Sequence, residues 1–212
     1  DLLPWVDIII ADLHYVYSLT AKLGNTMDTD GWRWTVLLDE AHTLPARART
    51  MYSVTLAKHA LLQARNSVSG NPAKTLTRIN QQFLRLLKKP WQEEEFDSSE
   101  HLPAELVQAL QAFTNAVTEQ LAQVPAYLQR HPVVMEFYFA VLQFLRVAEL
   151  WDSDFRFQLF RSTGRQSLCV TLNCLDPARL LASRQGRAHA VIAFSATLSP
   201  LPWSRSALGL SE

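Results

Sequence analysis

The sequence predicts an α/β protein whose parallel sheet is interrupted by a long helical insertion. Three observations predict this fold class. Short apolar runs, typical of buried parallel strands, lie toward the two ends of the chain at residues 34–38 and 190–194. Between residues 54 and 151, the apolar residues recur instead at helical spacing. We therefore expect a partial α/β domain with an all-α domain inserted into it.

The composition describes a globular chain. It has 212 residues, of which 48% are hydrophobic and 19% charged, and its formal net charge is zero. Its two cysteines, Cys169 and Cys174, are too few for a disulfide framework and fit a reducing compartment. The apolar run at residues 8–10 is too closely bracketed by Asp7 and Asp12 for a membrane span. We expect no membrane association and a cytoplasmic location, or a nuclear one in a eukaryote.

The first part of the chain predicts alternating strands and helices. Residues 5–11 are typical of a short buried strand, and residues 13–23 of a helix. The apolar run 34–38 predicts a second strand. Pro45 favours the first turn of a helix that extends to about residue 52. We assign residues 1–53 to the first part of the α/β domain.

Residues 54–154 form the predicted helical domain. A polar, acidic connection at residues 90–102 separates its helices. Three segments carry apolar residues at i, i+3, i+4 and i+7, which indicates helices with one buried stripe each. These stripes are Leu76, Ile79, Phe83, Leu86 and Leu87; Leu106, Leu110, Phe113, Val117, Leu121 and Val124; and Val134, Phe137, Val141, Phe144, Val147 and Trp151.

Residues 155–212 return to the α/β pattern. Strands are predicted at 155–161, 167–172 and 190–194. Asp176 and Pro177 are typical of a cap and first residue of a short helix that ends near residue 183.

Opposite charges are concentrated in two successive stretches of the chain. No Asp or Glu occurs between His42 and Gln92, whereas acidic residues dominate from Glu93 to Asp154. A surface of one sign attracts polyanions, so we expect part of the basic stretch to contact DNA phosphates. The alternative is that the basic helices pair with the acidic ones. The candidate DNA contacts are Arg47, Arg49, Lys58, Arg65, Arg78, Arg85 and Lys88.

The strand at residues 34–38 ends in Asp39-Glu40-Ala41-His42. Ligands of parallel sheets bind beyond the carboxyl ends of the strands. An Asp there can hold Mg²⁺ beside a nucleotide phosphate, and a Glu beside it can orient or deprotonate the attacking water. The alternative is a strand that ends in two acids by chance.

A second apolar strand ends in Ser195-Ala196-Thr197-Leu198-Ser199-Pro200. The hydroxyl groups of Ser195 and Thr197 can hydrogen-bond a neighbouring carboxylate or histidine, and so respond to what occupies that site. The alternative is a helix cap, where Ser and Thr are common.

Together these motifs resemble motifs II and III of superfamily 2 helicases. The Ser-Ala-Thr-Leu-Ser-Pro form, preceded by Cys174-Leu175-Asp176-Pro177, is similar to that of the XPD/DinG family of iron–sulfur DNA helicases. Residues 11–17 also resemble a segment that precedes motif II in that family. The family carries a helical arch domain between the two motifs, which matches the position of the helical insertion. The resemblance implies a partial RecA-like motor domain that is interrupted by the arch.

The resemblance also implies a function and residue roles. The family translocates on single-stranded DNA at the expense of ATP, mostly 5′ to 3′, and unwinds duplex at forks during repair or replication. Asp39 would be associated with Mg²⁺ and Glu40 would activate water. His42, Ser195, Ala196 and Thr197 would couple the nucleotide site to DNA movement.

Some parts of the family pattern are missing from this sequence. It has no Gly-x-x-x-x-Gly-Lys-Ser/Thr phosphate loop, and the family's second motor domain and cluster-binding cysteines would lie outside residues 1–212. We therefore expect a fragment of an ATP-dependent helicase that binds no iron–sulfur cluster and is inactive alone. The competing hypothesis is a non-enzymatic helical module that binds a protein partner; such a partner could also bind the arch of a helicase.

Overall fold

The computed structural model describes residues 5–29, 31, 33–91, 93, 95–161 and 168–210. The chain forms two compact units, one made of Asp1–Tyr52 with Asp176–Glu212 and the other of Ser53–Leu175. We call these unit 1 and unit 2. Because both chain crossings lie at residues 52–53 and 175–176, unit 2 is an insertion in unit 1.

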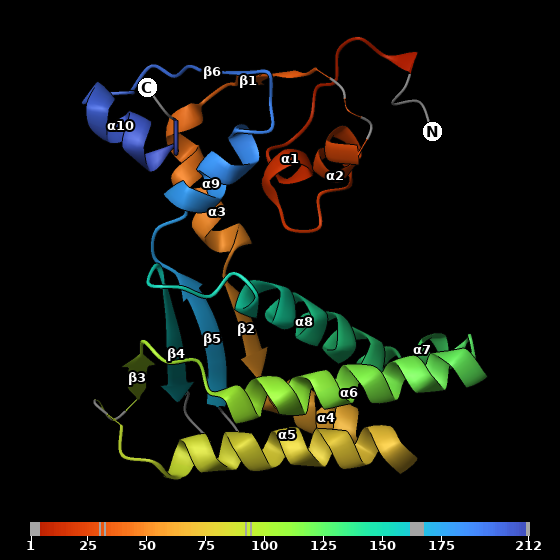
Figure 1. The fold of residues 1–212 in the computed structure, drawn as a ribbon. Coiled ribbons are helices and arrows are strands. Elements are labelled where there is room, and N and C mark those ends of the chain that lie inside the picture. The colour runs from red at the N-terminus through yellow and green to blue at the C-terminus, as the bar shows by residue number, and fades with distance from the viewer. Residues whose placement is uncertain are drawn as a thin grey trace. The chain divides into compact units, whose positions relative to one another are not determined.

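Unit 1 contains a two-stranded parallel sheet, β1–β6, in which Thr35 lies opposite Ala190 and Leu38 opposite Ala193 (Figure 1). Its interior contains Tyr17, Leu38, Leu44 and Leu181. The phenol of Tyr52 donates a buried hydrogen bond of 2.8 Å to the carbonyl of Tyr17. The elements of unit 1 are α1 (His14–Tyr17), α2 (Lys22–Thr29), β1 (Thr35–Leu38), the 3-10 turn η2 (Ala41–Thr43), α3 (Leu44–Met51), α9 (Ala178–Gln185), β6 (Ala190–Ala193) and α10 (Leu201–Ala207).

The described residues of unit 2 form a four-stranded antiparallel sheet, in the order β2-β5-β4-β3, and five helices. Figure 1 shows α5, α6 and α8 side by side, and α5 packs on α6, which packs on α8. Helices α4 and α8 also pack on β2 and β5. The elements are β2 (Val54–Ala57), α4 (Lys58–Asn66), α5 (Gly70–Lys88), β3 (Phe96–Ser99), α6 (Ala104–Gln123), α7 (Tyr127–Arg130), α8 (Pro132–Ala148), β4 (Phe155–Arg161) and β5 (Leu168–Cys174).

The amphipathic stripes become the core of unit 2. Ile79 and Phe83 of α5, Phe113 of α6, and Val141 and Phe144 of α8 are all fully buried. Strands β4 and β5 alternate buried and partly exposed residues along most of their length, as expected for a sheet with one face on a core. The prediction of amphipathic helices, and the α/β class with a small parallel sheet, are confirmed.

The insertion is not all-α, however, and its boundary differs from the predicted one. Strand β5 pairs with both β2 and β4, and β3 pairs with β4, so residues 155–175 belong to unit 2 rather than to the α/β domain. Strand β3 lies inside the polar segment 90–102, where we expected only a connection. Residue 167, the predicted start of β5, lies outside the described residues.

The predicted strand at residues 5–11 is also wrong. This segment pairs with no strand among the described residues, and its apolar side chains are largely in solvent, with Trp5 85% and Ile10 97% exposed. An apolar run forms a strand only when a neighbouring strand supplies its hydrogen-bond partners. The predicted helix at 13–23 is instead the short α1 and the beginning of α2, and α10 was not predicted.

Candidate functional site

Unit 1 brings the two sequence motifs together at the carboxyl end of its sheet. The parallel pairing continues past the strands: the Phe194 amide donates to the Leu38 carbonyl at 3.0 Å, and the Ala41 amide donates to the Phe194 carbonyl at 3.1 Å. These bonds place Ser195 beside the turn at residues 39–42. Because a parallel sheet fixes which strand ends meet, backbone pairing alone aligns the two motifs.

Three side chains meet at this edge. Ser195 Oγ donates to Glu40 Oε2 at 3.2 Å and lies 2.7 Å from His42 Nδ1. The same His42 nitrogen is 3.2 Å from Glu40 Oε2. When the Ser195 hydroxyl donates to Glu40, His42 Nδ1–H can donate to the Ser195 oxygen, so one serine links the histidine to the carboxylate. We call Glu40, His42 and Ser195 the switch cluster.

The turn that carries Glu40 is unusual. Glu40 has φ 47 and ψ 42, which is the left-handed conformation that few residues other than glycine adopt. The backbone amide of Glu40 donates a hydrogen bond to Asp39 Oδ1 at 2.8 Å. Its carbonyl accepts from both the amide and the hydroxyl of Thr43, each at 2.9 Å. The backbone therefore turns sharply after β1 and directs the Glu40 carboxylate toward Ser195.

Asp39 lies next to this cluster and is exposed. No group of three or more His, Cys, Asp or Glu in the described part of the chain could hold a metal ion. A single carboxylate still fits Mg²⁺, which keeps several waters and is usually bound by one or two carboxylates together with substrate phosphates. Asp39 therefore suits a Mg²⁺ ion that arrives with a nucleotide.

The other predicted members of the second motif are less involved. The Thr197 amide donates to Ser195 Oγ at 3.4 Å, and Ala196 and Thr197 are both exposed. Within the described residues, the side-chain hydrogen bonds between the two motifs all involve Ser195. Thr197 thus supports the serine through its backbone rather than contacting Glu40.

A cavity of about 980 Å³ in unit 1 lies beside β1. Its walls include the apolar residues Ile8, Ile10 and Leu37, whereas Arg33, Asp39, Glu40 and Arg47 contribute charge. Of these two arginines, Arg47 is already paired with Asp12. Asp39 and Glu40 therefore lie at the edge of a cavity whose wall is both apolar and charged.

Sequence reasoning missed an ion-pair cluster in unit 1. Arg47 on α3 donates to both oxygens of Asp12, at 2.8 and 2.6 Å, and His14 Nδ1 lies 2.6 Å from Asp12 Oδ1. The hydrogen bond from Arg47, followed by those from His14, holds the pKa of Asp12 well below its ordinary value. Only the Asp12-x-His14 spacing was visible in the sequence; the partner lies 35 residues away.

The predicted DNA contacts fall in different environments. Arg47 is neutralised by Asp12, and Lys58 is buried at 6% exposure, so neither is placed to bind a phosphate. Arg49 is exposed on α3 of unit 1. Arg65 is half-buried on α4 and donates to Asn66 at 3.3 Å. Arg78, Arg85 and Lys88 are exposed on α5 of unit 2.

No helix of the described chain is long and apolar enough to span a membrane. Cys174 is buried and Cys169 half-buried on β5, and neither forms a disulfide within the described residues.

No family model matches the sequence, and no curated protein matches it significantly. Solved structures, however, match its fold. A structure described as an XPD helicase matches with a TM-score of 0.51 and 16% identity over 93% of this chain and 33% of its own. One described as an XPD apo form matches with a TM-score of 0.52 and 16% identity over 92% of this chain and 37% of its own. The chain thus spans about a third of these proteins. The predicted resemblance is confirmed in the fold: this chain is folded like part of an XPD helicase.

Proposed function

We propose that this chain is part of an ATP-dependent DNA helicase of the XPD/DinG type. Unit 1 is then part of the first motor domain and unit 2 is the arch. The observation that supports this proposal best is the hydrogen bond from Ser195 to Glu40, which joins residues 155 positions apart. The likeness to XPD helicase structures supports the same assignment from the fold.

In this proposal each residue of the site has a separate role. Asp39 would hold Mg²⁺ that arrives with the nucleotide, and the ion would supply charge stabilisation for the transferred phosphoryl group. Glu40 accepts a hydrogen bond from the attacking water and orients it. The switch cluster restrains Glu40, because Ser195 and His42 both lie within 3.2 Å of Glu40 Oε2. The remaining oxygen, Oε1, is then available to the water.

The shared oxygen also supports a coupling role for Ser195 and His42. Ser195 follows β6 and His42 follows β1, so a displacement of one strand end relative to the other alters how many donors reach Glu40. A carboxylate with fewer donors is a stronger base. Movement driven by single-stranded or forked DNA would in this way change the basicity of the Glu40 carboxylate, and with it the rate of hydrolysis.

The complete helicase would translocate on single-stranded DNA with 5′-to-3′ polarity and act in repair or replication. The phosphate loop, second motor domain and cluster ligands do not occur in residues 1–212. We therefore propose that the chain alone neither hydrolyses ATP nor binds an iron–sulfur cluster. Its location would be the cytoplasm of a bacterium, or the nucleus in a eukaryote.

The test is DNA-stimulated ATP hydrolysis by the complete helicase that contains this sequence. Glu40→Gln keeps the size of the side chain but removes its negative charge, and we expect kcat to fall by about 10²–10⁴-fold. Glu105→Gln, at an exposed position on α6, is the matched control and should leave kcat unchanged. Retained hydrolysis in the Glu40→Gln enzyme would exclude the role proposed for Glu40.

A further inference from the structure

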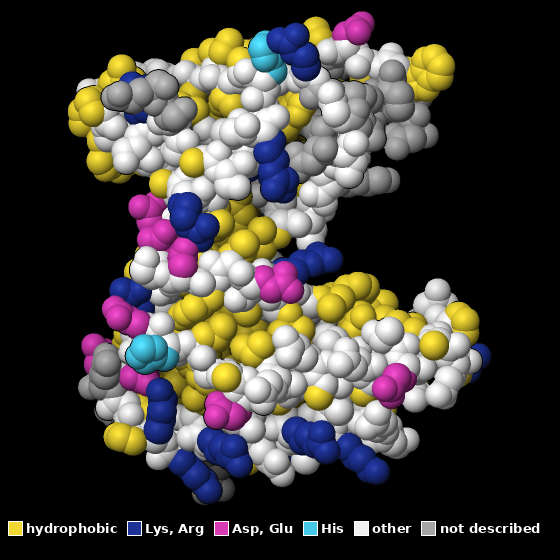
Figure 2. Space-filling view, in the orientation of Figure 1, with side chains coloured by type: hydrophobic (Ala, Val, Ile, Leu, Met, Phe, Trp, Pro, Cys, Tyr) yellow, Lys and Arg dark blue, Asp and Glu magenta, His cyan; other side chains and the backbone are white. Residues whose placement is uncertain are grey.

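Lys and Arg side chains are spaced along the part of unit 2 where α5 lies (Figure 2). The buried face of this helix carries Leu76, Ile79 and Phe83, and the opposite face is exposed. At 100° per residue, the four basic residues of the exposed face lie within an arc of about 80°, and they span about 21 Å along the axis. This basic row consists of Lys74, Arg78, Arg85 and Lys88.

Among the described residues, no carboxylate forms an ion pair with the basic row. Helix α5 contains no Asp or Glu. Across the described residues, the ion pairs of unit 2 are Lys89 with Asp97 and Arg156 with Glu100, and neither includes the basic row. Lys89 shows the contrast, because it lies one residue beyond the helix and is paired at 2.8 Å.

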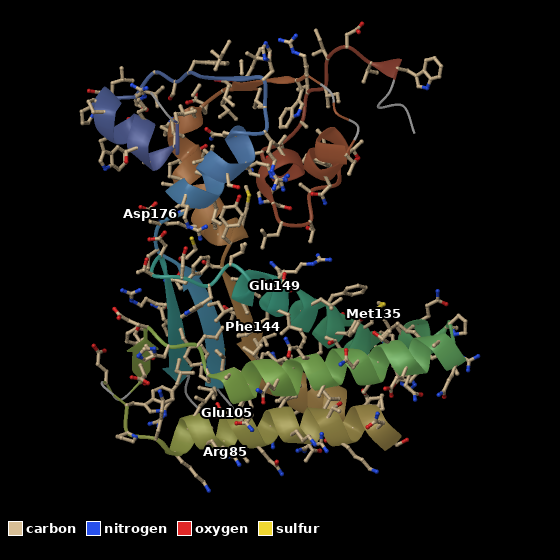
Figure 3. The ribbon with its side chains drawn as sticks, in the orientation of Figure 1. Arg85, Glu105, Met135, Phe144, Glu149 and Asp176 are labelled. Atoms are coloured by element: carbon tan, nitrogen blue, oxygen red, sulfur yellow. The ribbon has the colours of Figure 1, made fainter. Side chains whose placement is uncertain are left out.

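The expected alternative, that basic helices pair with acidic ones, is not what holds α5 in place. Helix α6 packs beside α5. Within the described residues, the side-chain hydrogen bond between the two helices runs from Asn71 on α5 to Glu119 on α6, at 3.3 Å, and involves no cation. Glu105, at the other end of α6, is exposed (Figure 3). The two helices are joined through their apolar stripes, which leaves the cations of α5 available to a ligand.

The chemistry of this face favours a phosphodiester backbone. The polar side chains Thr77 and Gln81 are exposed between the cations, and such groups also contact phosphates. The face has a single exposed large apolar residue, Leu84 at 39%, whereas a protein interface has an apolar centre. The face has no aromatic residue on which a base could stack. It would therefore contact the charged backbone and not distinguish one base sequence from another.

We propose that the basic row of α5 binds the phosphate backbone of DNA without sequence preference. At 3.4 Å per nucleotide of a strand, about 21 Å of helix can follow roughly six phosphates. This inference deepens the proposed function, because it selects one helix face of unit 2 from the scattered candidates. It excludes Arg47 and Lys58 and adds Lys74, which the sequence-based set did not contain.

The test measures the salt dependence of DNA binding by the 212-residue chain. Binding of a labelled single-stranded oligonucleotide is followed by fluorescence anisotropy over a range of salt concentrations. The variant combines Arg78→Gln, Arg85→Gln and Lys88→Gln. Because each phosphate contact contributes about 0.7 to the slope of log K against log salt, losing three should reduce the slope by about 2. A blunt-ended duplex in a parallel titration, at about 0.9 per contact, shows which form the face prefers.

The matched control removes three exposed arginines that lie elsewhere and are not candidate DNA contacts, through Arg130→Gln, Arg146→Gln and Arg179→Gln. It has the same net charge as the α5 variant but should keep the wild-type slope. Circular dichroism of both variants checks that they are folded. An unchanged slope in the α5 variant, or an equal loss in the control, would overturn the proposal. So would tighter binding of polyglutamate than of DNA, because the ligand would then be an acidic protein.

These outcomes are independent of the ATPase test. DNA binding by this chain requires neither Glu40 nor a nucleotide. A helicase that loses hydrolysis on Glu40→Gln while the α5 variant binds DNA normally would refute only the basic row. The reverse result would refute only the role of Glu40.

Discussion

The two units differ in how completely they bury their sheets. In unit 2, the inner faces of β4 and β5 are buried beneath helices, and Phe155, Phe157 and Leu172 are all at most 1% exposed. In unit 1, Leu37 and the residue opposite it, Ile192, are 66% and 53% exposed. Unit 2 therefore has a core of its own, whereas unit 1 leaves apolar sheet surface in solvent. The proposed chemistry lies on the unit with the less complete core.

The largest expected effect tests the core of unit 2. Phe144 on α8 is fully buried, and Phe144→Ala should lower the free energy of unfolding by about 3–5 kcal/mol, because the lost apolar contacts leave a cavity (Figure 3). Phe139 lies on the same helix at 56% exposure, so Phe139→Ala is the control and should change it by less than about 0.5 kcal/mol. Urea unfolding measures both. Equal effects would mean that Phe144 does not lie in a packed core of unit 2.

A smaller effect is expected at the partly buried ion pair of unit 2. Lys89→Met leaves the carboxylate of Asp97, whose side chain is 8% exposed, without its 2.8 Å partner. An unsatisfied buried group costs about 1–3 kcal/mol, and the exposure of Lys89 favours the lower end. Glu100→Gln weakens an exposed pair instead and should cost less than about 1 kcal/mol. Thermal unfolding measures the loss of stability in both variants. Equal losses would mean that water replaces Lys89 as the partner of Asp97.

The smallest effect concerns pH and unit 1. Because Arg47 and His14 stabilise the charged form of Asp12, its pKa is lowered in the folded chain. The associated stability is present above the unfolded pKa of about 3.9, and is lost as pH falls through the lower folded pKa. In a carboxyl-carbon NMR titration, the pKa of Asp12 should lie below its unfolded value of about 3.9, and Arg47→Gln should move its midpoint upward. An unmoved midpoint would show that Arg47 is not the main cause.

The sequence predicted those features that depend on local periodicity. Helices α5, α6 and α8 follow from their apolar stripes, and β1 and β6 from apolar runs that end in polar motifs. Strands β2 and β3 have only four residues each, and most of β3 (Phe96–Ser99) is polar. They are strands because they pair with β5 and β4, and such distant pairing is not visible as a pattern in the local sequence. The segment 5–11 shows the opposite error, an apolar pattern without a strand partner in the described chain.

For the candidate site, the residue types were predictable and their contacts only in part. The acidic motif and Ser195 were recognised from sequence, and parallel pairing of β1 with β6 brings them together. The positive φ of Glu40 was not predictable, because no glycine marks that turn. Which cations are free was not predictable either: Arg47 and Arg78 look alike in sequence, but Asp12 neutralises only the first.

The backbone of Glu40 places two demands on one position. A left-handed conformation costs a residue with a Cβ roughly 1–2 kcal/mol, and glycine avoids that cost. Glycine has no carboxylate, and asparagine, which also tolerates the conformation, has no negative charge. A redesign that optimised only the folding energy of unit 1 would therefore replace the residue on which the proposed hydrolysis depends. Stability and the proposed activity are opposed at this single turn, and improvements in folding have to be sought elsewhere in the chain.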